Sequence, residues 1–389
     1  MKQEYTDIIH RCFRCGWCKL PANYVDFNCP SYLKYRFESF ASGGRMWLIR
    51  AWLSGEIEPS ERLARILFSC TTCKNCVETC AIPKIKDMLV DIFISAREDF
   101  VNTGIIPPAV RDYLKAMSIS GNPYKRPQEE RGAWSDGLGI PAYNGQEYLF
   151  YVGDEGSYDE IGMKMARATA GLLRDAGVSF GILGAEETSD GNEVKALGEA
   201  GLALHLMNET IRTMAERGVK KIITLSPHGY NAFRNDYPAL GGALEVYHYT
   251  QIFGFKFNDR MPKRRLDAKV TFHDPCYLGR WNNEYWAPRF VLGSVPGISL
   301  VEMERSREQA LCCGGGGGNF FTDMIGSGRD SSASARVREA VETGAEILAV
   351  ACPVCYKMFD DAVKAEGLEG KIRVRDVAGI VCDGAGDKG

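Results

Sequence analysis

The sequence predicts a multidomain α+β protein, in which a mostly α-helical N-terminal domain precedes two α/β repeats with parallel sheets. Three observations favour this fold. Helical patterns and dense cysteine runs share the first hundred residues, strands alternate with helices after residue 147, and one strand-and-turn pattern occurs twice. We expect four units: residues 1–100, an ordered linker at 101–147, a first repeat at 148–265 and a second repeat at 266–389.

The composition excludes several classes of protein. The 389 residues carry a net charge of −3, which favours neither nucleic acid nor an acidic lipid surface as a partner. The chain has no apolar run of about 18 residues, and its start, MKQEYTDIIHRC, lacks the apolar core of a signal peptide. Fourteen cysteines at short spacings in such a chain indicate metal ligands, not disulfides. We expect a cytoplasmic protein of low-potential or anaerobic metabolism, peripheral to a membrane only through a partner.

Two cysteine runs lie in the N-terminal domain. Residues 12–29 read C-F-R-C-G-W-C-x10-C, and residues 70–80 read C-T-T-C-K-N-C-V-E-T-C. Each C-x-x-C-x-x-C run with a later fourth cysteine matches the ferredoxin arrangement for [4Fe-4S] cubanes, in which the fourth cysteine serves the other cluster. We therefore expect two cubanes, one on Cys12, Cys15, Cys18 and Cys80, the other on Cys70, Cys73, Cys76 and Cys29. The gap before Cys29 is longer than in ferredoxins, and zinc ribbons are the alternative.

The first half of the chain contains four helical patterns. Apolar residues recur at helical spacing over 45–53 and 61–68, and further candidates span 84–100 and 108–117. The three tryptophans of the N-terminal domain, Trp17, Trp47 and Trp52, are expected to exclude water from the clusters. The linker is rich in proline and glycine, but its Trp and Tyr residues favour an ordered crossing onto the next domain.

The region after residue 147 alternates between strands and helices. Apolar strand patterns cover 148–152, 178–183 and 221–225, and amphipathic helix patterns cover 161–176 and 199–217. A glycine follows each helix pattern, as is typical of a helix end with left-handed backbone. This order predicts a parallel sheet that holds ligands at the carboxyl ends of its strands.

An internal repeat links the two α/β units. Residues 221–230 align with 347–356 at a proline and a tyrosine, and residues 188–191 align with 311–314. The first copy then has no cysteine where the second has one: Asp154 or Glu155 replaces Cys276, Asp190 replaces Cys313, Ser226 replaces Cys352 and Gly229 replaces Cys355. Because these side chains are poor substitutes for soft thiolates, we expect the first repeat to be a scaffold without a cluster. Chance similarity of two α/β segments is the alternative.

Five cysteines of the second repeat follow the pattern C-x35-CC-x38-C-x-x-C, with the adjacent pair opening a run of five glycines. Thiolates are soft ligands that suit iron–sulfur clusters, and glycines let the backbone pass close to inorganic sulfide. A structural zinc site would be filled by four ligands, whereas five are present.

This pattern resembles the cysteine-rich CCG domain of the catalytic subunits of heterodisulfide reductase. Similar domains occur in iron–sulfur subunits of glycolate oxidase and anaerobic glycerol-3-phosphate dehydrogenase, and in redox subunits of sulfate respiration and benzoyl-CoA reduction. With the N-terminal cysteine runs, the resemblance covers nearly the whole chain. It implies a noncubane [4Fe-4S] cluster at which a disulfide is cleaved, in addition to the two cubanes. The implied ligands, and catalytic residues, are Cys276, Cys312, Cys313, Cys352 and Cys355.

Three other side chains are weaker candidates. His273 precedes the Cys276 loop and could donate a proton to a leaving thiolate, or could fix the loop by hydrogen bonds. Arg280 could meet an anionic substrate, although a structural role is favoured. His228 of the first repeat could face the cluster across the pseudo-twofold axis.

The leading functional hypothesis is an oxidoreductase subunit in which two cubanes pass single electrons to a CCG cluster that reduces a disulfide or oxidises thiols. The alternative is a pure electron-transfer subunit that links a flavoprotein, a hydrogenase-like unit, a membrane quinone or cytochrome subunit or an acyl-CoA reductase to its partner. The chain has no flavin or nicotinamide fingerprint, so a partner subunit is expected to handle electron pairs. A zinc-stabilised interaction protein is a third possibility.

Overall fold

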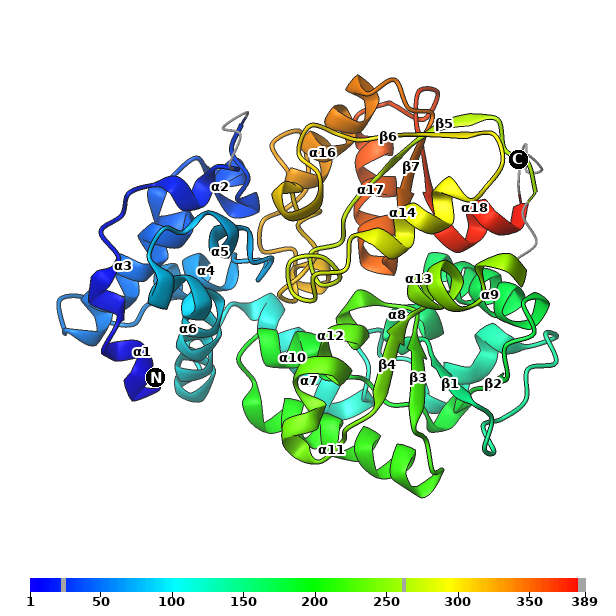
Figure 1. Cartoon of the computed structure of the whole chain (residues 1–389). Helices are drawn as coiled ribbons and strands as arrows, with labels where there is room; N and C mark the ends of the chain where they lie inside the picture. Colours follow the sequence, from blue (N-terminus) through cyan, green and yellow to red (C-terminus); the bar gives the residue numbers. More distant parts are fainter. Residues whose placement is uncertain (22–25, 261–263, 384–389) are drawn as a thin grey trace.

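The computed structural model describes residues 1–21, 26–260 and 264–383. A helical N-terminal part lies beside two α/β units that are stacked on each other (Figure 1). This arrangement confirms the predicted fold class. The helices of the N-terminal part and linker are α1 (Gln3–Thr6), α2 (Pro30–Tyr35), α3 (Ser42–Leu53), α4 (Glu61–Phe68), α5 (Asn75–Thr79), α6 (Pro83–Thr103) and α7 (Pro108–Ser120), with short 3-10 turns η1 (Ile9–Arg11), η2 (Trp17–Lys19), η3 (Glu38–Phe40) and η4 (Gln128–Ser135).

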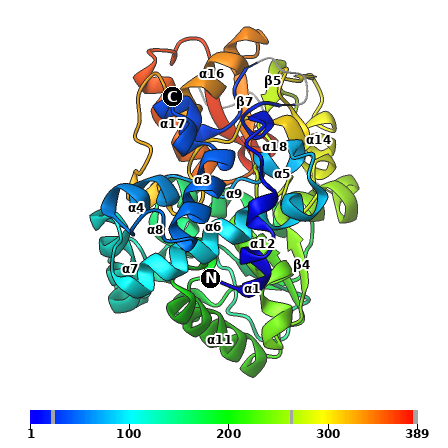
Figure 2. The same cartoon turned by 90° about the vertical axis from the view of Figure 1, so that its left-hand side faces the viewer.

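Local sequence explains where these helices begin and end. Helix α4 starts after Ser60, whose side chain accepts a hydrogen bond from the Leu63 N–H and so satisfies one free donor of the first turn. Helix α6 has Pro83 in its first turn and ends at Gly104, which adopts left-handed backbone. Seen from the side of the N-terminal part, these helices lie across both α/β units (Figure 2).

The two α/β units have the same sheet. Each contains four parallel strands in the order second, first, third, fourth, namely β2-β1-β3-β4 and β6-β5-β7-β8. The strands are β1 (Tyr148–Tyr151), β2 (Phe180–Gly181), β3 (Lys221–Thr224), β4 (Glu245–His248), β5 (Ala268–Phe272), β6 (Ile298–Val301), β7 (Ile347–Val350) and β8 (Arg373–Asp376). This shared topology gives structural support to the repeat inferred from sequence.

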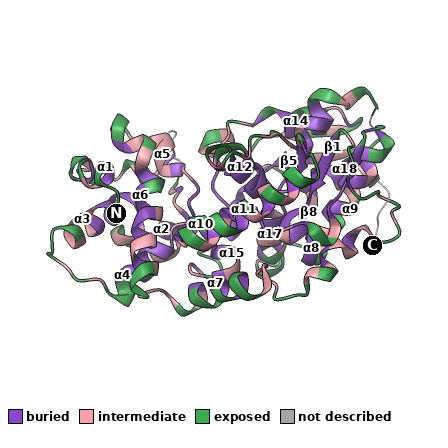
Figure 3. Cartoon of the chain, turned by 90° about the horizontal axis from the view of Figure 1, so that it is seen from below, coloured by how far each residue is buried: buried purple, intermediate pink, exposed green. Residues whose placement is uncertain are grey.

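Helices of both repeats cover the faces of the sheets. In the first repeat they are α8 (Gly153–Tyr158), α9 (Glu160–Asp175), α10 (Asn192–Ala196), α11 (Ala200–Glu216), α12 (Pro227–Asn235) and α13 (Tyr249–Gln251), with η5 (Gly184–Glu186), η6 (Tyr237–Leu240), a π-helical turn η7 (Ile252–Lys256) and η8 (Asn258–Arg260). In the second repeat they are α14 (Trp286–Gly293), η9 (Arg307–Gln309), α15 (Asn319–Thr322), α16 (Ser332–Glu342), α17 (Pro353–Ala365) and α18 (Val377–Asp383). The strands and inner helix faces are buried, and the outer helix faces are exposed (Figure 3).

The two repeats share one hydrophobic core. Phe150 and Leu172 of the first repeat belong to the same buried cluster as Phe272 and Ile380 of the second. Helix α18 packs on α9, which closes this core from the side of the C-terminal segment. Since burial of apolar surface is the main favourable term in folding, the repeats are expected to stabilise each other.

Two predicted elements differ from the structure. The predicted strand at 178–183 is reduced to Phe180–Gly181, because Ile182 pairs with Ala142 of the linker. A Cβ on Gly181 would lie only 2.7 Å from the Tyr143 Cα, so glycine allows this close crossing. Helix α8 was not predicted; its start is stabilised by Glu187, which accepts hydrogen bonds from the backbone N–H groups of Val152 and Gly153. Within the described residues, no helix has both the length and the apolar character required to span a membrane.

Candidate metal centres

The first cysteine set surrounds a small cavity in the N-terminal part. Cys12, Cys15 and Cys18 of the first run line this cavity together with Cys80 of the second run. The turn of η2 and the start of α6 bring the two runs together. Cys15 is exposed, so this cavity is the one nearest to the surface.

The second set surrounds a neighbouring cavity. Cys29 lines it with three cysteines of the second run, Cys70, Cys73 and Cys76. Cys18 borders both cavities, so the two are in direct contact. The fold therefore places Cys80 beside the first run and Cys29 beside the second. This grouping corresponds to the exchange of fourth cysteines that the spacing predicts.

The five cysteines of the second repeat converge on one buried site. The chain reaches them at Cys276 after β5, at Cys312 and Cys313 after η9, and at Cys352 and Cys355 at the start of α17. All five are buried. The Sγ atoms of Cys312 and Cys276 lie 3.9 Å apart, and those of Cys355 and Cys313 lie 3.4 Å apart. Five converging soft sulfurs fit an iron–sulfur assembly better than a four-ligand zinc site.

The electrostatics of this site favour thiolates at Cys313 and Cys352, whereas hydrogen bonds to neighbouring cysteines raise the pKa of Cys312 and Cys355. Hydrogen bonds from the thiols of Cys312 and Cys355 lower the pKa of Cys313 well below its usual value. Although burial opposes a charge on Cys352, hydrogen bonds from Cys355 and His228 lower its pKa to about 6. Cys352 is also the N-cap residue of α17, where the helix dipole stabilises negative charge. Because only the thiolate ligates a metal, these residues are prepared for ligation.

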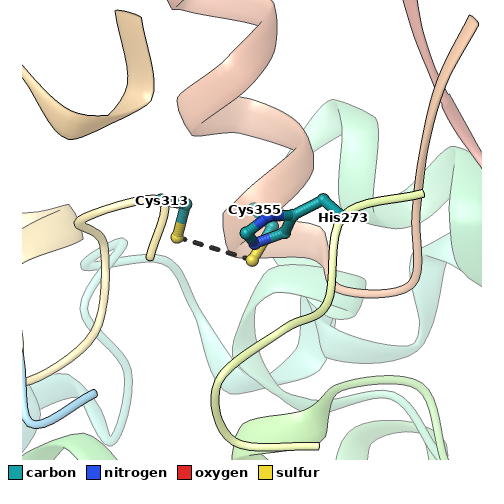
Figure 4. A group of neighbouring side chains, drawn as sticks. All are labelled: His273, Cys313 and Cys355. Carbon is teal, nitrogen blue, oxygen red and sulfur yellow. Dashed lines mark hydrogen bonds between the residues drawn. The ribbon is translucent and has the colours of Figure 1, made fainter. Parts of the chain in front are cut away.

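His273 lies beside the sulfurs of Cys313 and Cys355 (Figure 4). One ligand atom of each of these residues lies within 4.8 Å of the others, which is a geometry suited to a metal ion. Arg336 Nε donates a hydrogen bond to His273 Nδ1 at 3.3 Å, so that Nε2 is left to face the cysteines. Burial lowers the pKa of His273, although the Cys313 sulfur opposes this shift.

The second repeat and the second N-terminal cavity meet at Cys73. Cys73 belongs to the same buried cluster as Cys312, and an interaction with the Cys312 thiol lowers the pKa of Cys73 to about 5. Thr71 Oγ1 also lies 4.0 Å from Cys312 Sγ. The CCG site is therefore a direct neighbour of the second cysteine run.

Two further features hold this junction together. Arg280 donates from Nε to the Cys73 carbonyl at 2.6 Å and from Nη1 to the Ala310 carbonyl at 2.6 Å, which assigns it a structural role between the two cysteine loops. A Cβ on Gly316 would lie 2.8 Å from the Thr71 carbonyl, and one on Gly317 would lie 2.7 Å from the Cys70 carbonyl. The glycine run thus allows two backbones to approach, a role that the sequence did not reveal.

The equivalent positions of the first repeat hold buried or partly buried oxygen atoms in place of sulfur. The strands of the two repeats pair in the same register, since Leu149 pairs with Ile222 in the first repeat and Thr271 pairs with Leu348 in the second. In this register Asp154 is the structural counterpart of Cys276. Asp154 accepts a hydrogen bond from the buried Arg131 at 2.6 Å.

Carboxyl groups dominate around this position. Burial raises the pKa of Glu155 to about 8 and that of Asp190 to about 7. Ser226, the counterpart of Cys352 in the first repeat, caps α12 by accepting a hydrogen bond from the His228 N–H. These side chains supply hard oxygens and no thiolate, so the donor set does not fit a second iron–sulfur cluster.

One contact crosses from the first repeat into the CCG site. The His228 ring lies 4.5 Å from that of Tyr277, and an interaction with His228 helps to lower the pKa of Cys352. His228 Nδ1 lies 2.6 Å from Glu193 Oε1. The other carboxylate oxygen of Glu193 accepts a hydrogen bond from the Gly318 N–H of the glycine run. The sequence suggested His228 as a candidate but did not suggest Glu193. In the alignment of the two repeats, Glu193 is the counterpart of Gly316.

Comparisons with known proteins agree with these sites. Residues 8–82 match the family described as "4Fe-4S dicluster domain", and residues 270–360 match the family described as "Cysteine-rich domain". A subunit of the dihydromethanophenazine:CoB–CoM heterodisulfide reductase of Methanosarcina barkeri is 30% identical over 410 residues, which cover 96% of this chain and 93% of that protein. The chain belongs to the family of CCG-domain iron–sulfur oxidoreductases.

Other relatives in this family are longer. The probable iron-sulfur-binding oxidoreductase FadF of Bacillus subtilis is 37% identical over 328 residues, or 81% of this chain and 46% of that protein. The EtfAB:quinone oxidoreductase of Syntrophomonas wolfei is 30% identical over 423 residues, or 95% of this chain and 57% of that protein. The chain thus spans about half the length of these two relatives. A solved structure of a hypothetical protein from Helicobacter pylori shares the fold, with a TM-score of 0.59 at 11% identity over 100% of this chain and 74% of that one.

Proposed function

We propose that the chain is an electron-transferring subunit of a larger redox complex. Electrons enter or leave at the cubane held by Cys12, Cys15, Cys18 and Cys80. They pass through a second cubane held by Cys29, Cys70, Cys73 and Cys76, and reach a noncubane [4Fe-4S] cluster on the five cysteines of the second repeat. The observation that carries this proposal is the packing of the second cysteine run against the CCG site: Cys73 and Cys312 share one buried cluster, and Thr71 Oγ1 lies 4.0 Å from Cys312 Sγ.

Two features of the fold support this order. Cys18 and Ser42 line both N-terminal cavities, so the two cubane sites are adjacent. Only the first set includes an exposed cysteine, which makes it the accessible end of the path for an outside partner. The proposal keeps four units, with bounds at 1–100, 101–147, 148–265 and 266–389. The first repeat, 148–265, is then a scaffold that holds no cluster.

The reaction we propose at the CCG site is disulfide reduction, in which one S–S bond, two electrons and two protons yield two thiols. When bound there, an iron–sulfur cluster would supply electrons one at a time. Cys276, Cys312, Cys313, Cys352 and Cys355 would hold it, and the surrounding apolar residues would exclude water. His273 Nε2, which faces Cys313, is placed to donate a hydrogen bond to a leaving thiolate; delivery of a proton would require the imidazolium, which the lowered pKa of His273 disfavours.

A second candidate function is pure electron relay. All five CCG cysteines are buried, a geometry that favours passage of electrons over entry of a bulky disulfide. The relative named EtfAB:quinone oxidoreductase suggests a flavoprotein and a quinone-linked protein as the partners in that case. The test is an anaerobic assay of the purified chain with a reduced viologen dye and the CoM–CoB heterodisulfide. Turnover supports disulfide reduction, whereas intact clusters without turnover support the relay.

The iron content tests the number of clusters. We expect a brown protein with about 12 iron atoms and as many acid-labile sulfides per chain after anaerobic purification, because three clusters hold four irons each. Iron and sulfide analysis measures this directly. About 8 irons would remove the CCG cluster from the proposal, and about 16 would show a cluster in the first repeat. A colourless protein with zinc would contradict the redox function altogether.

A further inference from the structure

Two large aromatic side chains are exposed beside the first cysteine set. Phe13 is 67% exposed and Trp17 is 52% exposed, and in the sequence they stand on either side of Cys15, the exposed cysteine of that set. Phe13 also lines the cavity that the four cysteines surround. Because aromatic side chains are enriched at the core of protein interfaces, this pair indicates a contact surface at the mouth of the site.

The same surface is rich in basic residues. The two segments that carry this cysteine set, residues 8–20 and 80–90, contain one acidic residue, Asp87, and five basic ones: Arg11, Arg14, Lys19, Lys84 and Lys86. Arg11, Arg14 and Lys84 are exposed, whereas Lys19 is paired with Glu38. Since the whole chain carries a net charge of −3, this is a local concentration of positive charge.

Helix α3 fixes part of this surface. The Arg14 guanidinium lies 4.4 Å from the centre of the Trp47 ring, and that of Arg50 lies 4.9 Å from the same ring. Trp47 Nε1 donates a hydrogen bond to the Cys12 carbonyl at 2.7 Å, which ties the helix to the first cysteine run. Helix α3 lies on the side of the N-terminal part that faces away from the two α/β units (Figures 1 and 3). The basic residues are therefore presented away from the rest of the chain.

We propose that a docking face, formed by Arg11, Phe13, Arg14, Trp17 and Lys84, binds a small acidic protein that carries one electron at a time. This inference rests on the proposed function, because it assumes a cubane on the first cysteine set. Opposite charges steer the two proteins together, and the aromatic pair supplies the apolar contact. In each encounter the carrier loses one electron and the cubane gains it, or the reverse. An anionic lipid would also suit the charge, but only a redox carrier makes use of the exposed cysteine.

The test is stopped-flow reduction of the full, cluster-loaded chain by a reduced, acidic [4Fe-4S] ferredoxin. The second-order rate constant of the wild-type chain should fall by more than about 10-fold between about 0.05 and 0.5 M salt, because screening weakens the attraction. A double variant, Arg11→Glu with Lys84→Glu, reverses two charges that do not line the cavity. At low salt its rate constant should be more than about 10-fold below that of wild type, and salt should no longer lower it.

The matched control is a second double variant, Lys220→Glu with Lys371→Glu, at two exposed lysines of the α/β units. It has the same net charge as the first double variant and should react like wild type. In both double variants the iron content and the extent of reduction by dithionite should equal those of wild type. Trp17→Ser tests the apolar contact, and should lower the rate constant by about fivefold while the salt dependence persists.

The outcomes separate this inference from the proposed function. Reduction of the first cubane without later reduction of the CCG cluster would overturn the electron path and leave the docking face standing. If ferredoxin failed to reduce a wild-type cubane that dithionite reduces, or if neither salt nor Arg11→Glu with Lys84→Glu changed the rate, the docking face alone would be overturned. It would also be overturned by a wild-type dimer that this double variant loses, or by binding to phosphatidylglycerol vesicles that ferredoxin does not displace. Those results would assign the face to a second copy of the chain or to lipid.

Discussion

Replacing Cys313 by serine is expected to remove the iron of the second repeat, with a loss of about four irons per chain and a fall in turnover of more than about 100-fold. Cys313 is buried beside Cys312, Cys355 and His273, and hydrogen bonds from Cys312 and Cys355 lower the pKa of its thiol well below the usual value. A serine hydroxyl is a hard donor that stays protonated near neutral pH, so it cannot replace this ligand. Iron analysis and the paramagnetic signal of the thiol-treated, oxidised protein measure the effect.

The matched control is Asp190→Ser, the same substitution at the equivalent position of the first repeat. Asp190 is partly buried near other carboxyl groups, desolvation raises its pKa to about 7, and no thiolate lies at the equivalent ligand positions. We expect its iron content to equal that of wild type. If Asp190→Ser lost iron while Cys313→Ser kept it, the cluster would be assigned to the wrong repeat. If neither variant lost iron, the double cysteine would be structural.

Replacing Cys76 by alanine is expected to remove the second cubane and to interrupt the path between the surface and the CCG site. Iron should fall from about 12 to about 8 atoms per chain, and the rate at which a protein donor reduces the CCG cluster should fall by more than about 100-fold. Rapid-freeze measurement of the CCG signal after mixing with the donor gives this rate.

Cys76 is a cleaner choice than Cys73 for this purpose. Cys73 shares one buried cluster with Cys312, so its loss would disturb the CCG site as well. Cys382 supplies the control, because its Sγ contacts the Ala168 carbonyl and belongs to none of the three cysteine sets. Cys382→Ala should keep all its iron, and an unchanged reduction rate in Cys76→Ala would contradict the path.

Local patterns in the sequence predicted most of the fold. The helices α3 and α4 and the strands β1 and β3 end within a few residues of their predicted limits, since apolar spacing and end-capping residues determine them. Cysteine spacing likewise predicted the sets that line the two cavities and the CCG site. These signals depend on residues that are close in the sequence, so they can be recognised without knowledge of the fold.

The contacts between distant segments could not be predicted in this way. The approach of Gly316 to Thr71 depends on how the N-terminal part docks on the second repeat, and a glycine run alone does not indicate its neighbour. Glu193 could have been found only by asking which residue of the first repeat aligns with the glycine run of the second. The short β2 also reflects a distant partner, because Ala142 of the linker takes the pairing position of Ile182.

The magnetic interaction between the second cubane and the CCG cluster tests the central claim most directly. Because Cys73 and Cys312 share one buried cluster, metal clusters bound at the two sites would be neighbours, and a reduced, paramagnetic cubane should speed the spin relaxation of the CCG signal. The signal should therefore saturate at higher microwave power in the reduced wild-type chain than in Cys76→Ala. Identical saturation in the two proteins, with both CCG clusters intact, would contradict the proposed path of electrons.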